Sequence, residues 1–248
     1  MQSTLATDAT LSAADVLLLT EVARQDLGSN PAGIDQARDL AQALAMDYVF
    51  AVEWDRRNIP GKEGEHGVAI LSKYPIGNVV VLRHVPVFDW YGEDGRLGGR
   101  MTLAADLRVG AELLRVYASH LDNRPYDPVA SQDGRNLQGA EIRADAAAPE
   151  RPAQVVVGGD LNTWVCNPTY FPYPDCTQAP DAEPVVQAFV AQWLDGTAGY
   201  NGHTYEESVV VRQRLDWLFL RGLARTAGGV VAGAAGSDHL PLYVDVQR

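Results

Sequence analysis

The chain has 248 residues, of which 46% are hydrophobic and 21% are charged. This composition is typical of a globular protein and excludes a disordered or collagen-like chain. The 32 acidic and 20 basic residues give a formal net charge of −12. Such a surface repels phosphate backbones, which disfavours tight, sequence-independent binding to long nucleic acid.

Neither a membrane span nor a signal peptide is predicted. No apolar run approaches the ~20 residues that a spanning helix needs, and the opening MQSTLATDAT has neither a basic segment nor an apolar core. The compartment therefore stays open. Cys166 and Cys176 match no zinc-binding spacing, which leaves a disulfide or two free thiols. We expect a monomer with a single domain over residues 1–248.

Short runs rich in aliphatic residues are separated by Gly, Pro, Asn and Asp, a pattern typical of strands and turns. Those at 14–22 and 154–162 are continuously apolar, which indicates strands buried on both faces. The predicted strands lie within residues 14–22, 48–54, 66–72, 78–87, 100–109, 112–122, 154–162, 214–222 and 239–247.

Three helices are predicted between these strands. In the first, Asn30 is the N-cap, Pro31 takes the first helical position, and an apolar face runs over residues 34–44. The others lie within residues 128–147 and at about 183–194. Many strands and few helices predict a four-layer α/β/β/α sandwich of two mostly antiparallel sheets flanked by helices.

Acidic and amide residues lie next to several of the buried runs. Glu21 follows VLLLT, Asp160 and Asn162 follow VVVGG, and Asp238 precedes HLPLY. Each alone is explained as a turn or cap residue, but their joint placement predicts a shared site. These hard oxygen ligands favour Mg²⁺, with Mn²⁺ or Ca²⁺ as alternatives.

Two histidines are placed to take part in chemistry. His239 follows Asp238 in SDHLPL, and His120 ends an apolar run in YASHLD. An imidazole accepts a proton from water near neutral pH, or donates a hydrogen bond to a phosphoryl oxygen. We expect the remaining histidines to be exposed or in turns: His66, His84 and His203.

Other catalytic motifs are absent, including G-x-S-x-G, H-E-x-x-H and the phosphate-binding G-x-x-x-x-G-K-[ST] loop. The ordered set DVLLLTEV, GVAILSKYPI, SHLD, GGDLNTW, RLDWLFL and GSDHLPL closely resembles the endonuclease/exonuclease/phosphatase family of metal-dependent phosphoesterases. The match runs from about residue 14 to the C-terminus.

The resemblance implies a site at one rim of the two sheets. Glu21 is then the principal metal ligand, with Asp238 close to the metal. Asp160 and Asn162 bind and orient the nucleophilic water and the phosphate.

The same resemblance implies roles for the histidines. His239 acts as general base, oriented by Asp216 of the RLDW segment, and His120 donates a hydrogen bond to a non-bridging phosphoryl oxygen. Whether Asp160 or His239 takes the proton of the water is left open. The expected reaction is Mg²⁺-dependent hydrolysis of a small or medium phosphoester by in-line attack of water, with Mn²⁺ as the alternative metal.

Two alternatives remain beside this reading. One is a DNA or RNA nuclease of the same family, with a local basic rim that offsets the net charge. The other is a catalytically silent binding module on the same fold. The rim would consist of Arg56, Arg57, Arg96 and Arg100.

Weaker substrate-binding candidates follow two of the motifs. Arg135 and Gln138 lie one helical turn apart, and a solvated helix face is the favoured interpretation. Trp164 begins an aromatic-rich stretch that either stacks on substrate or packs down. Trp217 is expected in the core.

One departure from the family pattern concerns the start of the chain. Family members begin with a strand that carries an Asn, whereas MQSTLATDAT has neither that Asn nor a strand pattern. We therefore expect an N-terminally short domain with an unpaired sheet edge and a gap in the site.

Overall fold

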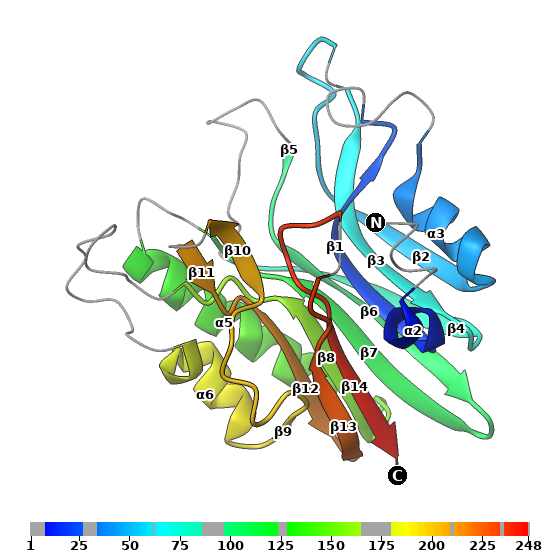
Figure 1. Ribbon diagram of the computed structural model, residues 1–248, viewed down its shortest axis with the longest axis vertical. Coiled ribbons are helices and arrows are strands. Elements are labelled where there is room, and N and C mark those ends of the chain that lie inside the picture. The colour runs from blue at the N-terminus through cyan, green and yellow to red at the C-terminus, as the bar shows by residue number, and fades with distance from the viewer. Residues whose placement is uncertain are drawn as a thin grey trace.

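A computed structural model describes residues 8–26, 34–61, 63–85, 97–123, 128–164, 180–208, 211–233 and 236–247 (Figure 1). In chain order the elements are α2 (Ala9–Ala13), β1 (Val16–Arg24), α3 (Gln36–Leu44), β2 (Asp47–Asp55), β3 (Glu65–Ser72), β4 (Ile76–Arg83), β5 (Leu97–Gly98), β6 (Met101–Val109), β7 (Glu112–His120), α5 (Pro128–Ala147), β8 (Gln154–Asp160), the 3₁₀ helix η1 (Pro180–Ala182), α6 (Pro184–Val190), β9 (Leu194–Asp195), β10 (Tyr205–Ser208), β11 (Val211–Gln213), β12 (Asp216–Arg221), β13 (Ala224–Val230) and β14 (Leu242–Gln247).

The strands form two larger sheets and two hairpins. One sheet has the order β4-β6-β7-β8-β12-β9, and the other has the order β1-β3-β2-β5. The hairpins are β10–β11 and β13–β14. Neighbouring strands in the larger sheets are antiparallel except for β7 and β8, which are parallel. The predicted mixed α/β fold with mostly antiparallel sheets is confirmed.

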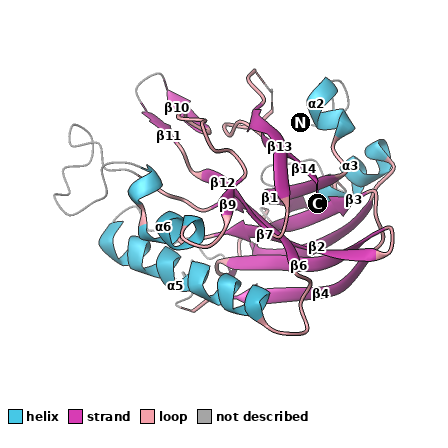
Figure 2. Cartoon of the chain, turned by 90° about the horizontal axis from the view of Figure 1, so that it is seen from below, coloured by secondary structure: helices cyan, strands magenta, loops and turns pink. Residues whose placement is uncertain are grey.

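Three apolar clusters hold these elements together. The two larger sheets pack against each other through residues such as Ile70 of β3 and Met101 of β6, both fully buried. Ile142 of α5 and Phe189 of α6 pack against the six-stranded sheet. A third cluster joins α2 and α3 to the four-stranded sheet. Figure 2 shows the two helix pairs on different sides of the strands.

The helix boundaries differ in part from the prediction. Asp35, not Asn30, caps α3, because its side chain accepts the Arg38 N–H at 3.1 Å; Asn30 and Pro31 lie outside the described residues. The predicted helix at 128–147 is confirmed. Its Gly139 permits close packing, since a Cβ there would lie 2.5 Å from a Val185 methyl group.

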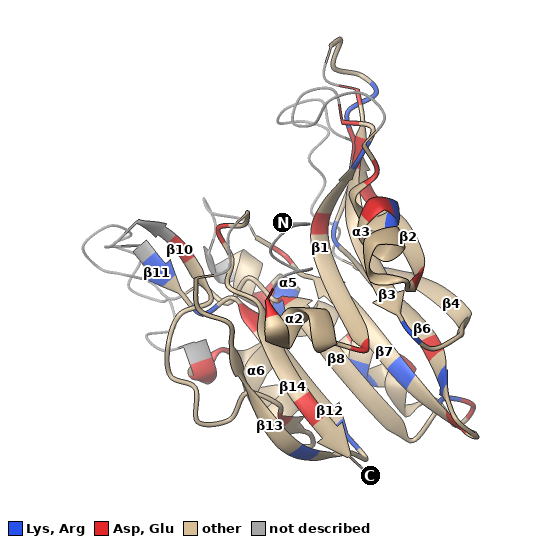
Figure 3. Cartoon of the chain, turned by 45° about the vertical axis from the view of Figure 1, so that its right-hand side comes forward, with Lys and Arg blue, Asp and Glu red and all other residues tan. Residues whose placement is uncertain are grey.

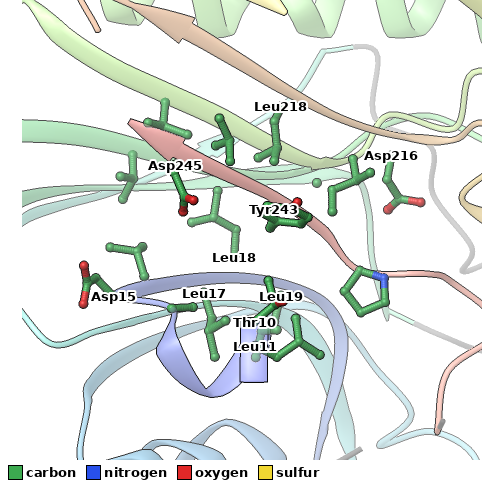
Figure 4. A pocket seen from close by; sticks show the side chains of 18 of the residues that line it. Thr10, Leu11, Asp15, Leu17, Leu18, Leu19, Asp216, Leu218, Tyr243 and Asp245 are labelled. Atoms are coloured by element: carbon green, nitrogen blue, oxygen red, sulfur yellow. The ribbon is translucent and has the colours of Figure 1, made fainter. Parts of the chain in front are cut away.

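Two edge strands face each other across an open cavity. Among the described residues, β3 is the only strand beside β1, which also makes one isolated bridge from Arg24 to Asp35, and β13 is the only strand beside β14. A cavity of about 810 Å³ lies between β1 and β14, and Leu18 and Tyr243 point into it (Figure 4). Leu18 is only partly buried, so β1 is not buried on both faces as predicted.

The sequence pattern does not predict β13, because its ARTAGGV segment has too few large apolar residues to indicate a strand. None of the described helices combines the length and apolar character that crossing a membrane requires.

Candidate active site

Three neighbouring strands bring three predicted residues into one row. Asp160 ends β8, and the strand register pairs it with His120 of β7 on one side and with Asp216 of β12 on the other. Residues that are 40 or more positions apart in sequence therefore lie side by side at one end of the six-stranded sheet. This placement follows from the parallel pairing of β7 and β8, which aligns their carboxyl ends.

His239 and Asp216 form a hydrogen-bonded pair at this row. Nδ1 of His239 lies 2.7 Å from Oδ2 of Asp216, and Nε2 lies 4.0 Å from Oδ2 of Asp160. Burial lowers the pKa of His239, but the hydrogen bond and charge of Asp216, with Asp160 and Asp238, outweigh burial and raise this pKa to about 9. The pair thus holds Nε2 toward Asp160 and favours the protonated imidazole at neutral pH.

Asp160 is buried between charged neighbours. Its Oδ1 accepts the Asn162 N–H at 2.7 Å, and its Oδ2 lies 3.6 Å from Nε2 of His120. Burial and the charge of Asp216 raise the pKa of Asp160, against the opposing effect of the two histidines. Asn162 has a φ of 51° and donates from Nδ2 to the Leu121 carbonyl at 3.0 Å, which fixes its turn.

A strand irregularity positions Glu21. The register of β1 shifts between Leu19 and Val22, and Glu21 has a φ of 54°. Its side chain is 63% exposed, and Oε1 lies 3.7 Å from Nε2 of His120. A left-handed conformation costs a residue with a side chain about 1 kcal/mol or more, and such strain is common at functional sites.

Two buried residues that sequence reasoning did not assign to the site complete it. Glu53 Oε2 lies 2.8 Å from Nδ1 of His120, and Glu53 Oε1 accepts from Arg100 Nη1 at 2.8 Å. Arg100 Nη1 also lies within 2.7 Å of both ring nitrogens of His120. Burial works to raise the pKa of Glu53, but His120 and Arg100 outweigh it and hold that pKa below its usual range.

The alternating sequence pattern of β2 indicates that Glu53 is a buried carboxylate. Ala51, Glu53 and Asp55 alternate on the buried face of the strand. A carboxylate at a position that period-two alternation assigns to the core needs a buried partner, since an isolated buried charge is very costly. The partners lie on the other sheet, which the sequence alone does not indicate.

The predicted basic rim is wrong for the described arginines. Arg100 is buried against Glu53, Arg56 pairs with Asp26 at 3.3 Å, and Arg57 pairs with Asp55 at 2.7 Å. Arg96 lies outside the described residues. In Figure 3 the basic segments are separated from one another by acidic or neutral ones.

His84 is fully buried, so the expectation of an exposed or turn histidine is wrong. Its Nδ1 lies 2.7 Å from Glu141 Oε2, and its Nε2 lies 2.8 Å from Thr102 Oγ1. His66 and His203 are partly buried and lie beside Asp26 and Glu206 respectively.

The solvated helix face expected at Arg135 and Gln138 is also wrong, because both residues are buried. Arg135 donates from Nε to Glu183 Oε1 at 2.9 Å, and Gln138 Oε1 accepts the Asp122 N–H at 2.8 Å. This helix face is therefore buried against Asp122, which follows β7, and Glu183, which precedes α6. The Arg135 guanidinium is paired with the Glu183 carboxylate.

The other predicted residues are distributed around this row. Asp238 is exposed, and its carbonyl accepts the Glu206 N–H at 3.1 Å. Trp164 packs edge-on against Tyr205 at a ring distance of 5.6 Å. Trp217 is buried in the core, as predicted. Cys166 and Cys176 lie outside the described residues.

The donor chemistry decides whether a metal ion fits. The described residues contain no group of three or more His, Cys, Asp or Glu side chains arranged around one metal position. Mg²⁺, however, usually keeps several waters and takes only one or two protein carboxylates. The exposed carboxylate of Glu21, beside His120 and near the row of strand ends, fits a hard divalent cation of this kind.

A family model described as the endonuclease/exonuclease/phosphatase family matches residues 3–239. The chain belongs to this family. Its members are generally hydrolases that act on phosphoesters and depend on divalent metals. A search among curated proteins found no match.

Solved structures share the family fold. An endonuclease/exonuclease/phosphatase from Beutenbergia cavernae DSM 12333 is 23% identical, with a TM-score of 0.73; the match covers 99% of this chain and 64% of that chain. The human Nocturnin catalytic domain with bound sulfate is 17% identical, with a TM-score of 0.64, over 99% and 86% of the two chains. The 3′ phosphatase NExo from Neisseria, bound to a product DNA hairpin, is 16% identical, with a TM-score of 0.64, over 99% and 93%.

Proposed function

We propose that this chain hydrolyses a small or medium phosphodiester or phosphomonoester by metal-dependent, in-line attack of water. The observation that carries the proposal is the Asp216–His239 hydrogen bond, which directs Nε2 of His239 toward Asp160. A base held in this way, next to a second carboxylate, is what the activation of a water molecule requires.

Each group then has a role set by its contacts. Asp216 holds the ring of His239, whose Nε2 accepts the proton of the attacking water when the ring is neutral. The rate of hydrolysis is therefore expected to rise with pH toward the His239 pKa of about 9. Asp160, braced by the Asn162 N–H, orients that water. The water oxygen forms the new bond to phosphorus while the bond to the ester oxygen breaks.

His120 binds the phosphate in this proposal. Glu53 accepts from Nδ1, and Nε2 lies 3.7 Å from Glu21 and 3.6 Å from Asp160, with Arg100 Nη1 at 2.6 Å. A protonated Nε2 at this position donates to a non-bridging phosphoryl oxygen and stabilises the charge that develops on it. A divalent cation at Glu21, with Mg²⁺ proposed first and Mn²⁺ second, supplies neutralisation of phosphate charge when bound.

A nuclease of the same family is the second candidate. The Neisseria relative is a 3′ phosphatase bound to a DNA hairpin, which favours it. The net charge of −12 and the pairing of Arg56 and Arg57 with carboxylates argue against a long nucleic acid substrate. A catalytically silent binding module is disfavoured by the intact row of Asp160, Asp216 and His239.

A phosphoester panel tests the proposal. It contains an activated phosphodiester, a phosphomonoester, single-stranded and double-stranded DNA, and RNA, each with Mg²⁺ and with EDTA. We expect metal-dependent turnover of the small esters that falls by roughly 10²–10⁴-fold in Asp160→Ala. Turnover of none of them, or equal turnover in the variant, would contradict the proposal.

A further inference from the structure

Two aromatic side chains extend outward from the His239 ring, Tyr205 in contact with that ring and Trp164 in contact with Tyr205. Tyr205 lies at a ring distance of 5.0 Å and an angle of 56° from His239. Trp164 lies edge-on to Tyr205, at 5.6 Å and 66°. Both aromatic side chains are partly buried, so each keeps some exposed surface. We call Trp164 and Tyr205 the aromatic wall.

The backbone holds the aromatic wall against the row of strand ends. Tyr205 forms an antiparallel bridge with His239, and the Leu240 N–H donates to the Thr204 carbonyl at 2.6 Å. The position of Tyr205 relative to the proposed base is therefore set by main-chain hydrogen bonds and not by side-chain packing alone.

Trp164 is anchored by the residue before it. The buried Thr163 hydroxyl donates to the Arg214 carbonyl at 2.6 Å and accepts from the indole N–H of Trp217 at 2.9 Å. Trp164 is also only two residues from Asn162. The Trp164 N–H donates to the Asn162 carbonyl at 2.8 Å and so closes the turn at Asn162. The backbone of Trp164 is therefore held next to Asn162.

The indole nitrogen of Trp164 gives a further indication. Its Nε1 is buried, and it has no hydrogen-bond partner within the part of the chain that the structure describes. A buried donor without an acceptor is destabilising. Hydrogen bonding of this group therefore does not explain a tryptophan here, whereas the flat apolar ring beside the row of strand ends does.

We infer that the aromatic wall is a binding subsite for a planar ring carried by the phosphoester, such as an aryl group or a nucleobase. This inference rests on the proposed phosphoesterase function and names the substrate class. Stacking accepts any flat ring and needs no specific hydrogen bond, which suits a wall without a charged side chain of its own. A phosphoester with only a short alkyl group gains nothing from it.

Three phosphodiesters with the same leaving group test the inference. Methyl, benzyl and thymidine 5′ esters of 2,2,2-trifluoroethyl phosphate share an aliphatic leaving group and differ only in the group that stays on phosphorus. We expect kcat/KM to be higher for the benzyl and thymidine esters than for the methyl ester. In Trp164→Ala this preference, expressed as a ratio to the methyl ester, falls by roughly 5- to 100-fold. The ratio cancels any loss common to all three.

Two further variants separate stacking from other effects. Trp164→Phe keeps a ring and removes the unpartnered donor, so it retains most of the preference. Tyr48→Ala, at an exposed tyrosine on β2, is the matched control and leaves the ratio unchanged. An unchanged ratio in Trp164→Ala, or an equal loss in Trp164→Phe, would overturn the inference.

Binding without turnover gives an independent measurement. Calorimetric titration compares phenyl phosphate with methyl phosphate on the wild-type chain and on the Trp164 variants. We expect tighter binding of phenyl phosphate to the wild type, and equal affinities overturn the subsite even if every ester is hydrolysed. If no ester is hydrolysed but phenyl phosphate still binds more tightly, the proposed function fails and the subsite stands.

Discussion

Glu53 Oε2 lies 2.8 Å from Nδ1 of His120, although the two residues are 67 positions apart in sequence. Glu53 belongs to β2 of the four-stranded sheet, and His120 ends β7 of the six-stranded sheet. This hydrogen bond therefore ties the two sheets together at the candidate site. It also fixes the ring of His120, so the packing of the sheets and the orientation of a phosphate-binding group depend on the same carboxylate.

Removing the Glu53 carboxylate is expected to destabilise the fold. Glu53→Ala leaves Arg100 buried without its charged partner, and breaking a buried pair in this way costs about 3–5 kcal/mol. The free energy of unfolding, measured by urea denaturation, checks this. Asp47→Ala, at an exposed position on the same strand, is the control and changes it by less than about 0.5 kcal/mol. A similar small change for Glu53→Ala would contradict a stabilising role of the pair.

Asp216 and His239 are expected to act as one unit. His239→Ala lowers kcat by roughly 10²–10⁴-fold, because a positioned base contributes about that much. Asp216→Asn lowers kcat through the loss of the hydrogen bond that holds the ring. The double variant is then no slower than His239→Ala alone, since Asp216 acts through His239. Additive losses in the double variant would show that Asp216 works independently.

The role of Glu21 as metal ligand is tested by titration. EDTA abolishes turnover and excess Mg²⁺ restores it if the proposal is right. Glu21→Gln keeps the size of the side chain but loses its charge, so the Mg²⁺ concentration for half-maximal rate rises by roughly tenfold or more. Glu112→Gln, at the far end of β7 from His120, serves as the control. An unchanged Mg²⁺ titration for Glu21→Gln would remove Glu21 from the metal site.

His84 makes stability depend on pH. Burial lowers its pKa from the ordinary value of 6.5, against the opposing effect of Glu141. As pH falls below about 6.5, the unfolded chain binds a proton at His84 that the folded protein does not, so the contribution of His84 to stability decreases with falling pH. Urea denaturation at pH 7.5 and pH 5.5, compared between wild type and a variant that lacks His84, measures this loss.

The matched variant for this effect is His84→Gln, which does not titrate. Between pH 7.5 and pH 5.5, its free energy of unfolding is expected to fall by less, or rise by more, than that of the wild type. The variant still responds to pH, because burial lowers the pKa of His66, whereas the raised pKa of His239 acts in the opposite direction. An equal change in wild type and variant would assign the pH dependence to other groups.

The strands and the row of strand-end residues could be predicted because their signals are local. Apolar runs followed by Asp160 or preceded by Asp238 mark buried strands and their ends. The partners of buried polar groups could not be predicted in the same way. Glu53, His84 and Arg135 are all satisfied by residues on other elements, and such pairings depend on the order of strands in the sheets and on helix packing.

Because β1, within the part of the chain that the structure describes, pairs with a neighbouring strand on one edge only, it is expected to unfold at a lower free energy than the centre of the six-stranded sheet. β1 carries Glu21, and among the described residues β3 is its only strand neighbour, apart from one bridge between Arg24 and Asp35. β8, which carries Asp160, is paired on both sides. Segments with fewer main-chain partners open with a smaller free energy than the rest of the fold. Under rising denaturant, β1 amides should exchange before those of β8, and metal binding should be lost while the six-stranded sheet is still intact.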